Sequence, residues 1–222
     1  MCFSASVSFA AGTSLLAVGV FTVKKARHRD ELPFAAIPLL FGVQQLIEGV
    51  LWLTFRFDSP VLNPAMTTLY SLFSHVLWPI YVPLAALLLE PARWRRIALA
   101  AFLAAGLGTG LYLLVSMFRF PIVSKAVGGH IEYVSLHFFI GPVMAGYLAA
   151  TCISMLFSSH RAVKLFGIAA LLSFVASYAV YTQWFFSVWC FFAAILSGIV
   201  LLHFTAAFSP TKEAPDGMAL RV

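Results

Sequence analysis

The residues with the clearest chemical potential lie in one apolar stretch, Leu32–Phe55, which is long enough to cross a membrane. Gln44, Glu48 and Trp52 are spaced four residues apart, so they share one face of a helix. Glu48 is the only acidic residue in any stretch that we expect to span a membrane. A carboxylate at membrane depth costs about 2.5–3.5 kcal/mol on insertion scales, so a proton, hydrogen bonds or a cation must offset that cost. We expect Glu48 to be functional; the alternative is a neutral Glu that only fastens helices together.

Other polar side chains are expected near the same depth. At 1.5 Å of rise per residue, Glu48 would lie about 10 Å below the outer surface and His75 about 12 Å. Ser71 precedes His75 by one helical turn, in the pattern Ser-x-x-x-His. His137 falls near the outer start of a later span, and Cys2 falls at the outer end of the first one. The outer half of the helices therefore collects the groups that bind metals.

Carboxylate, imidazole and thiolate groups suit zinc, and a catalytic zinc site has three protein ligands and an open position. We predict a site for zinc or another divalent metal, with Glu48, His75, His137 and Cys2 as ligands. Glu48, His75 and Ser71 would be the catalytic residues of a metal-dependent hydrolase, in which the metal lowers the pKa of bound water to roughly 7. The sequence holds no HExxH motif, so the prediction rests on depth alone.

Three other interpretations stay open. The same polar pocket would serve a non-catalytic transporter or a metal sensor, and the chain would also fit a structural subunit of a membrane complex. In the last case a histidine such as His75 or His137 only hydrogen-bonds to a neighbouring helix. Cys190, between Trp189 and Phe191, has the surroundings of a small buried thiol.

Composition defines the class of protein that must position these residues. Hydrophobic residues make up 62% of the 222 residues and charged residues only 10%, whereas soluble domains carry about 25% charged residues. We therefore predict an all-α, polytopic membrane protein with seven transmembrane helices. The expected spans are Ser4–Val23, Leu32–Phe55, Thr67–Leu89, Ile97–Phe118, Leu136–Phe157, Leu165–Trp184 and Ser187–Phe204.

The basic residues predict the orientation of these spans. With the N-terminus outside and the C-terminus cytoplasmic, eleven Lys and Arg residues fall in cytoplasmic segments and only three, Arg56, Arg119 and Lys125, fall outside. This is the bias that the positive-inside rule requires. The net charge of +6 thus reflects topology, and we expect no nucleic-acid partner. We expect a multi-pass protein of a bacterial inner membrane, in contact with membrane lipid and with a small-molecule or lipid substrate.

The chain is expected to hold one domain. Residues 1–208 would form the seven-helix transmembrane domain and residues 209–222 a disordered cytoplasmic tail. The longest internal loop, Arg119–Ser135, contains Gly128-Gly129 and could fold over the outer mouth of the bundle. Gly106 and Gly110 form a GxxxG pattern in span four, which favours close packing on a neighbouring helix or an oligomer through that span.

Two motifs carry a resemblance to known families. The opening Met-Cys-Phe-Ser-Ala-Ser, together with Phe41–Gly49, resembles a family of small bacterial integral membrane proteins of unknown function, which implies a membrane fold but no activity. Ser71-Leu72-Phe73-Ser74-His75 is similar to the Ser-x-x-x-His motif of the seven-span metal hydrolases that include alkaline ceramidases and adiponectin receptors. That likeness implies a zinc site within seven helices. The late His-x-x-x-His of those hydrolases is missing, since span seven holds only His203.

Overall fold

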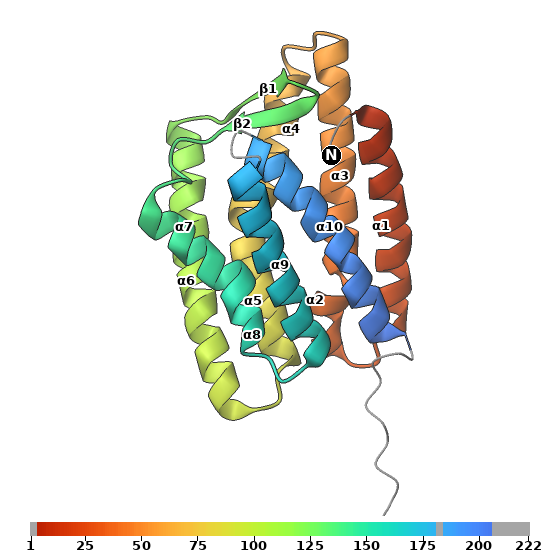
Figure 1. Ribbon diagram of the computed structural model, residues 1–222, viewed down its shortest axis with the longest axis vertical. Coiled ribbons are helices and arrows are strands. Elements are labelled where there is room, and N and C mark those ends of the chain that lie inside the picture. The colour runs from red at the N-terminus through yellow and green to blue at the C-terminus, as the bar shows by residue number, and fades with distance from the viewer. Residues whose placement is uncertain (1–3, 181–183, 206–222) are drawn as a thin grey trace, which may run out of the picture.

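The computed structural model describes residues 4–180 and 184–205, which form a bundle of apolar helices closed at one end by a β-hairpin (Figure 1). In the part of the chain that the structure describes, six helical stretches are long and apolar enough to cross a membrane: Ala5–Lys25, Arg29–Arg56, Leu62–Leu89, Arg93–Arg119, Arg161–Val180 and Phe185–Phe204. A shorter apolar helical stretch, Gly141–Leu156, lies between the fourth and the fifth of these. The prediction of a mostly helical protein with several apolar helices that could span a membrane is thereby confirmed.

Several of these stretches are assembled from more than one element. The first half of the chain forms α1 (Ala5–Lys25), the 3₁₀ turn η1 (Arg29–Glu31), α2 (Leu32–Ala35), α3 (Ile37–Arg56), α4 (Leu62–Ser71), the π-helix η2 (Leu72–Leu77), α5 (Trp78–Leu89) and α6 (Arg93–Arg119). The second half forms β1 (Val123–Val127), β2 (His130–Val134), α7 (Gly141–Leu148), the π-helix η3 (Ala149–Ile153), α8 (Ser154–Leu156), α9 (Arg161–Val180) and α10 (Phe185–Phe204).

The expected boundaries differ most from the structure at the fifth span. Its helix begins at Gly141 rather than at Leu136, because the residues before it form a turn and Pro142 occupies the first turn of the helix. Proline suits that position, where its missing N–H would have no partner in any case. The expected disordered tail, residues 209–222, lies outside the described residues.

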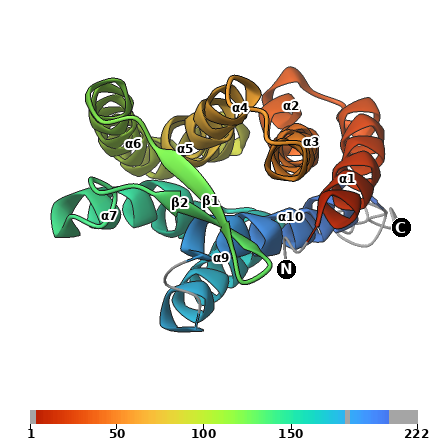
Figure 2. The ribbon, with the colours of Figure 1, turned by 90° about the horizontal axis from the view of Figure 1, so that it is seen from above.

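The helices form two rows when the bundle is seen from the hairpin end (Figure 2). One row holds α6, α5, α3 and α1, and the other holds α7, α9 and α10, with α10 inclined so that it contacts both α3 and α1. The hairpin lies across this end of the bundle (Figure 2). Helix α3, which carries Glu48, is therefore covered by α1 on one side and by α10 on the other.

Close packing holds α3 against α1. A Cβ atom added at Gly19 of α1 would lie 2.5 Å from the backbone nitrogen of Leu39, so only glycine allows this approach. At the same end of the pair, the Thr22 hydroxyl donates to the Ala35 carbonyl at 2.6 Å, although Thr22 is fully buried. A threonine that hydrogen-bonds across helices adds a polar fastening to this apolar contact.

The hairpin follows from local sequence and is tied to the bundle. Strands β1 and β2 pair antiparallel, with Val123 opposite Val134 and Val127 opposite His130. Gly128 and Gly129 join them with φ of +60° and +77°, as a two-residue turn with two left-handed positions demands. The Ser124 hydroxyl lies 2.6 Å from the Thr67 hydroxyl of α4. The long loop between α6 and α7 is thus an ordered cover for one end of the helices.

Candidate functional site: a buried carboxylate beside an aromatic cavity

Glu48 is fully buried in the middle of α3, with none of its surface exposed. The Ser187 hydroxyl of α10 donates to Glu48 Oε1 at 2.7 Å, and the Gln45 amide donates to Oε2 over a longer 3.4 Å. The other amide atom of Gln45, its Oε1, is buried without a hydrogen-bond partner. A buried carbonyl oxygen normally accepts a hydrogen bond, so an unpartnered one beside a carboxylate is an acceptor open to a cation or a water.

Gln44 extends this polar group toward the centre of the bundle. Its Oε1 accepts a hydrogen bond from the Trp78 indole at 2.7 Å, and its amide donates to the Cys190 sulfur at 3.3 Å. The Cys190 thiol also interacts with the Tyr70 hydroxyl and electrostatically with Glu48. Gln44 is fully buried, so these contacts satisfy an amide that would otherwise be costly in an apolar interior. Helices α3, α5 and α10 are joined here by side chains one turn from Glu48.

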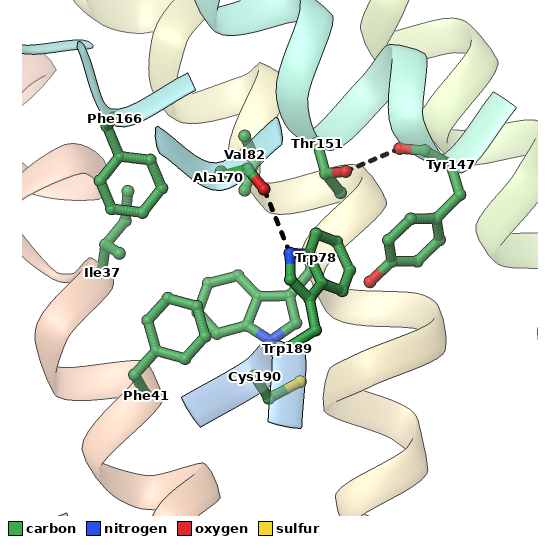
Figure 3. A pocket seen from close by; sticks show the side chains of 10 residues that line it. All are labelled: Ile37, Phe41, Trp78, Val82, Tyr147, Thr151, Phe166, Ala170, Trp189 and Cys190. Carbon is green, nitrogen blue, oxygen red and sulfur yellow. Dashed lines mark hydrogen bonds between the residues drawn. The ribbon is translucent and has the colours of Figure 1, made fainter. Parts of the chain in front are cut away.

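A cavity borders this polar group. Its volume is small, about 30 Å³. Figure 3 shows the ten side chains around it: Ile37, Phe41, Trp78, Val82, Tyr147, Thr151, Phe166, Ala170, Trp189 and Cys190. Half of these are aromatic, and Phe41 stacks on Trp78 with ring centroids 3.9 Å apart. A concave aromatic site with a few polar groups in its wall is typical of small-ligand binding.

The polar atoms of the far wall are already satisfied. The Trp189 indole donates to the Ala170 carbonyl at 3.2 Å, and the Thr151 hydroxyl donates to the Tyr147 carbonyl at 2.8 Å (Figure 3). The Tyr147 hydroxyl in turn donates to the Ser74 carbonyl. On the side of α3 and α10, Cys190 of the cavity wall accepts a hydrogen bond from Gln44 and interacts electrostatically with Glu48.

His75 occupies the π-helix η2, next to the cavity wall. Pro79 has no N–H to bond the His75 carbonyl four residues earlier, and the ladder widens so that the Trp78 N–H bonds to Phe73, five residues earlier. Fully buried His75 places Nδ1 2.8 Å from the Ser74 hydroxyl and Nε2 3.0 Å from the Ser135 hydroxyl. Such single π turns are frequent at functional sites.

A model of a family of unknown function (DUF6629) matches residues 1–216. The chain belongs to this family. No curated protein and no solved structure matches the chain. The resemblance to a family of unknown function is thus confirmed over almost the whole chain. The family supplies no activity, so the function has to be argued from the geometry of the site.

Two of the predicted site residues, Glu48 and His75, contact the same short segment at the start of α10. Glu48 contacts Ser187, and the His75 ring stacks on Phe186 with centroids 4.5 Å apart. Their expected similarity in depth is consistent with this arrangement. Ser71 is also buried, but its hydroxyl has no hydrogen-bond partner; His75 instead hydrogen-bonds to the backbone carbonyl of Ser71.

The remaining predicted ligands do not join Glu48 and His75 among the described residues. His137 lies in the turn between β2 and α7, where its ring packs 4.8 Å from Phe120 and its Nε2 is buried without a hydrogen-bond partner. Within residues 4–180 and 184–205, no three His, Cys, Asp or Glu side chains gather closely enough to hold a metal ion. Cys2 lies outside the described residues. The zinc site therefore stays a prediction.

The sequence did not indicate two residues of the site, Ser187 and Ser135, and it indicated Cys190 only as a small buried thiol. Ser187 and Cys190 begin α10, where the sequence predicted only the outer end of a span, and Ser135 ends the hairpin. Ser187 is the first residue of the expected seventh span, at its outer end, whereas Glu48 was expected about 10 Å deeper, so depth gave no signal of this contact. Nothing in the sequence pairs Ser135 with His75, because 60 residues separate them and the hairpin brings them together.

A second polar cluster lies at the opposite end of the bundle and connects helices. Glu90, which follows α5, accepts hydrogen bonds from the Ser159 hydroxyl at 3.0 Å and from the Ala92 N–H at 3.1 Å. Burial alone would raise the pKa of the Glu90 carboxyl, but these hydrogen bonds and one from the Ser159 N–H hold that pKa below its ordinary value of 4.5. The charged form of Glu90 thus ties α5 to the loop before α9.

Proposed function

We propose that this protein is a membrane transporter that binds a small hydrophobic organic cation in the aromatic cavity and exchanges it for a proton on Glu48. The observation that carries the proposal is the fully buried carboxylate of Glu48, which interacts electrostatically with Cys190 in the wall of a cavity with aromatic side chains. This interpretation develops the transporter alternative that the sequence left open.

The aromatic walls favour a cation with an apolar surface. The faces of Trp, Tyr and Phe rings attract cations, by about 2 kcal/mol or more where water is excluded, and Trp is the strongest of them. Trp78, Trp189 and Tyr147 all line the cavity. An alkyl-substituted ammonium group would fill such a space with apolar contacts and place its charge against the rings. A carboxylic acid or a phosphate would find no cationic side chain among the residues that line it.

Glu48 supplies the coupling to a proton. Within a bilayer a carboxylate is least costly when it is protonated or when a cation lies close to it. A proton on Glu48 and a cation in the cavity would both relieve the same burial cost, so each would weaken the binding of the other. Such competition is the requirement for exchange, in which a proton that enters from one side expels the cation on the other.

The size of the cavity requires movement during binding. A cavity of about 30 Å³ admits only one or two water molecules, so a larger ligand must widen the site. Pro79 and Pro83 both remove backbone donors from α5, and the π-helix η2 precedes them directly. Helices bend most readily at such positions. We infer that α5 moves relative to α9 and α10 when the ligand enters.

We also propose that the chain crosses the membrane seven times, with the hairpin end outside and the C-terminus in the cytoplasm. Helices α1, α6 and α9 have basic residues at the end opposite the hairpin, namely Lys24 and Lys25, Arg93, Arg95 and Arg96, and Arg161 and Lys164 (Figure 1). Among residues 4–180 and 184–205, the basic residues at the hairpin end are Arg56, Arg119 and Lys125. The positive-inside rule then assigns the basic end to the cytoplasm. Glu48 would face the cavity from the outer half of the membrane.

Binding of tetrapropylammonium to the detergent-solubilised protein tests the function. Trp78 and Trp189 line the cavity, so binding should change tryptophan fluorescence. We expect the affinity to rise with pH, by about tenfold per unit where Glu48 is mostly protonated, because one proton competes with one cation. Glu48→Gln should bind at least tenfold more weakly and lose the pH dependence. Glu90→Gln, which removes a carboxylate at the other end, should bind as wild type does.

Two results would overturn this proposal. One is the absence of binding by wild type across the pH range in which it stays folded. The other is a Glu48→Gln variant with the affinity and pH dependence of wild type. In proteoliposomes the same exchange should appear as uptake of tetrapropylammonium driven by an outward proton gradient.

The metal-dependent hydrolase is the second candidate. It is favoured by the approach of Glu48 to Ser187 and of His75 to the adjacent Phe186, from different helices. Its predicted ligands His137 and Cys2 would have to complete the set. Metal analysis of the purified wild type and of Glu48→Ala would distinguish it from the exchanger, since the exchanger needs no bound metal.

A further inference from the structure

The contact between His75 and Ser135 has the geometry of a base and its nucleophile. The Ser135 hydroxyl lies 3.0 Å from His75 Nε2, within the range in which a histidine can take a proton from a serine. This pair is separate from the cavity and is not used by the exchange proposed above. Its position is the product of the hairpin, since Ser135 directly follows β2.

The hairpin holds Ser135 in place through its neighbours. Tyr133, two residues before it, stacks on Tyr70 of α4 with centroids 4.5 Å apart and rings within 9° of parallel. Across the hairpin, Ser124 is tied to Thr67 at 2.6 Å. A nucleophile gains from such support, because reacting groups must keep their geometry to be effective.

The imidazole is oriented from its other side. His75 Nδ1 faces the Ser74 hydroxyl at 2.8 Å, and the ring also hydrogen-bonds to the Ser71 carbonyl, one turn earlier in its own helix. A carbonyl oxygen only accepts, so the His75 ring donates to Ser71, and we assign this donor to Nδ1, the ring nitrogen nearer the backbone of its own helix. With the proton on Nδ1, Nε2 presents its lone pair to Ser135. Phe186 stacks on the ring and Phe138 packs edge-on at 5.5 Å, which keeps it from turning.

The surroundings of Ser135 indicate what would reach it. Ser135 itself is half-buried, and the next residue, Leu136, is 76% exposed. Phe120 is 56% exposed and Ile140 is 42% exposed at the same end of the bundle. Apolar side chains at the end of a membrane helix bundle lie at the level of lipid headgroups and ester linkages. A lipid ester could therefore approach Ser135 from the side.

We propose that Ser135 and His75 hydrolyse carboxylic esters of membrane lipids at the hairpin end of the protein. Ser135 Oγ attacks the ester carbonyl carbon while its proton passes to His75 Nε2. The bond between the carbonyl carbon and the alcohol oxygen then breaks, and the alcohol leaves with that proton. Water attacks the acyl-serine, gives its proton to Nε2, and the fatty acid departs as Ser135 takes the proton back. The balance is one ester and one water consumed, and one acid and one alcohol formed.

A fluorophosphonate probe, which reacts with activated serines, tests this assignment. The full-length protein in detergent is treated with the probe, and mass spectrometry identifies the modified residue. We expect one phosphonate at Ser135 and none in Ser135→Ala. His75→Gln should react at least 100-fold more slowly, since a general base contributes roughly 10²–10⁴-fold. Ser173→Ala, which removes a serine of α9 that hydrogen-bonds to the Ala170 carbonyl of its own helix, should react at Ser135 as wild type does.

The site of labelling in wild type decides the question without any variant. Folded protein that carries no phosphonate at Ser135 after long exposure overturns the proposal. An equal labelling rate in wild type and in a His75→Gln variant that keeps the wild-type melting temperature overturns it as well. If His75→Gln does not fold, Ser74→Ala is compared instead, because it removes a partner of His75 Nδ1 and leaves the aromatic packing of the ring. A labelling rate equal to that of wild type in this variant counts against the Ser135–His75 pair. Loss of tetrapropylammonium binding would not affect this proposal, since the cavity is not involved.

Discussion

Gly106 of α6 offers a sharp test of the helix packing that positions the site. A Cβ atom added there would lie 1.9 Å from the Pro79 carbonyl oxygen of α5 and 2.9 Å from its carbonyl carbon. Real Cβ atoms essentially never approach a neighbour closer than 3.0 Å. Helices α5 and α6 would therefore have to separate by at least 1.1 Å, the difference between 3.0 and 1.9 Å, in a Gly106→Ala variant. The backbone oxygen cannot turn aside as a flexible side chain would.

Gly108, two residues further along the same helix, is the matched control. Nothing lies within 4 Å of a Cβ added at that position. Both substitutions replace glycine by alanine in a helix interior, so both gain the same helix propensity, about 0.5–1 kcal/mol. The difference in stability between the two variants then isolates the clash. Overpacking of this kind costs about 1–3 kcal/mol.

Thermal unfolding in detergent, followed by tryptophan fluorescence, measures this difference. At roughly 2–4 °C per kcal/mol for a chain of 150–250 residues, we expect Gly106→Ala to melt about 2–12 °C below Gly108→Ala. Equal melting temperatures for the two variants would refute the close approach of α6 to Pro79. Pro79 follows the π-helix of His75, so we also expect Gly106→Ala to slow the labelling of Ser135.

Three further predictions concern charge, topology and metal. Hydrogen bonds lower the pKa of Glu90 in the folded state, so its contribution to stability is present above the ordinary pKa of 4.5 and is lost as the pH falls through the folded value. Glu90→Gln should therefore melt below wild type at pH 7, and this difference in melting temperature should be smaller at pH 3. An equal difference at the two pH values would contradict this reasoning. A cysteine placed at Arg27 should resist an impermeant maleimide in intact cells, and one placed at Gly129 should react; the reverse pattern would invert the proposed orientation. If the predicted metal site is filled, a chelator should lower the melting temperature of the protein and zinc should restore it. A wild-type melting temperature that does not respond to the chelator would exclude the zinc-dependent hydrolase.

The glycines of span four also answer part of a question left open by the sequence. The GxxxG pattern favours close packing without telling which helix comes close. Both glycines face α5 in the structure, with Gly106 against Pro79 and Gly110 against Val76 and Ile80. The pattern is thus used within the chain. An oligomer through this span stays a prediction, and it would have to use the other face of α6, where Gly108 lies.

Hydropathy alone was sufficient for most of the spans because the signal is local. In a bilayer, a run of some 20 apolar residues has to pair its backbone N–H and C=O groups internally. A helix does so whichever helices lie beside it. The fifth span was less well predicted, because Leu136 and the residues up to Ile140 are apolar but form a turn. Apolar composition does not distinguish a span from an exposed turn at the membrane surface. Gly128-Gly129 indicates a turn in the loop, but a hairpin also needs two strands that pair, and strand pairing is not a local property of the sequence.

The sequence by itself determined that Glu48 is a buried acid in a membrane helix, since composition and spacing leave a carboxylate inside an apolar run. Only the tertiary structure decided which groups meet it. Ser187 reaches Glu48 across 139 residues and Ser135 reaches His75 across 60, because α10 inclines over α3 and the hairpin folds over η2. Hydrogen bonds act over about 3 Å, whereas sequence periodicity gives only the face and the depth of a residue. The partners of a buried polar group therefore depend on how the helices lie against one another, which no single span encodes.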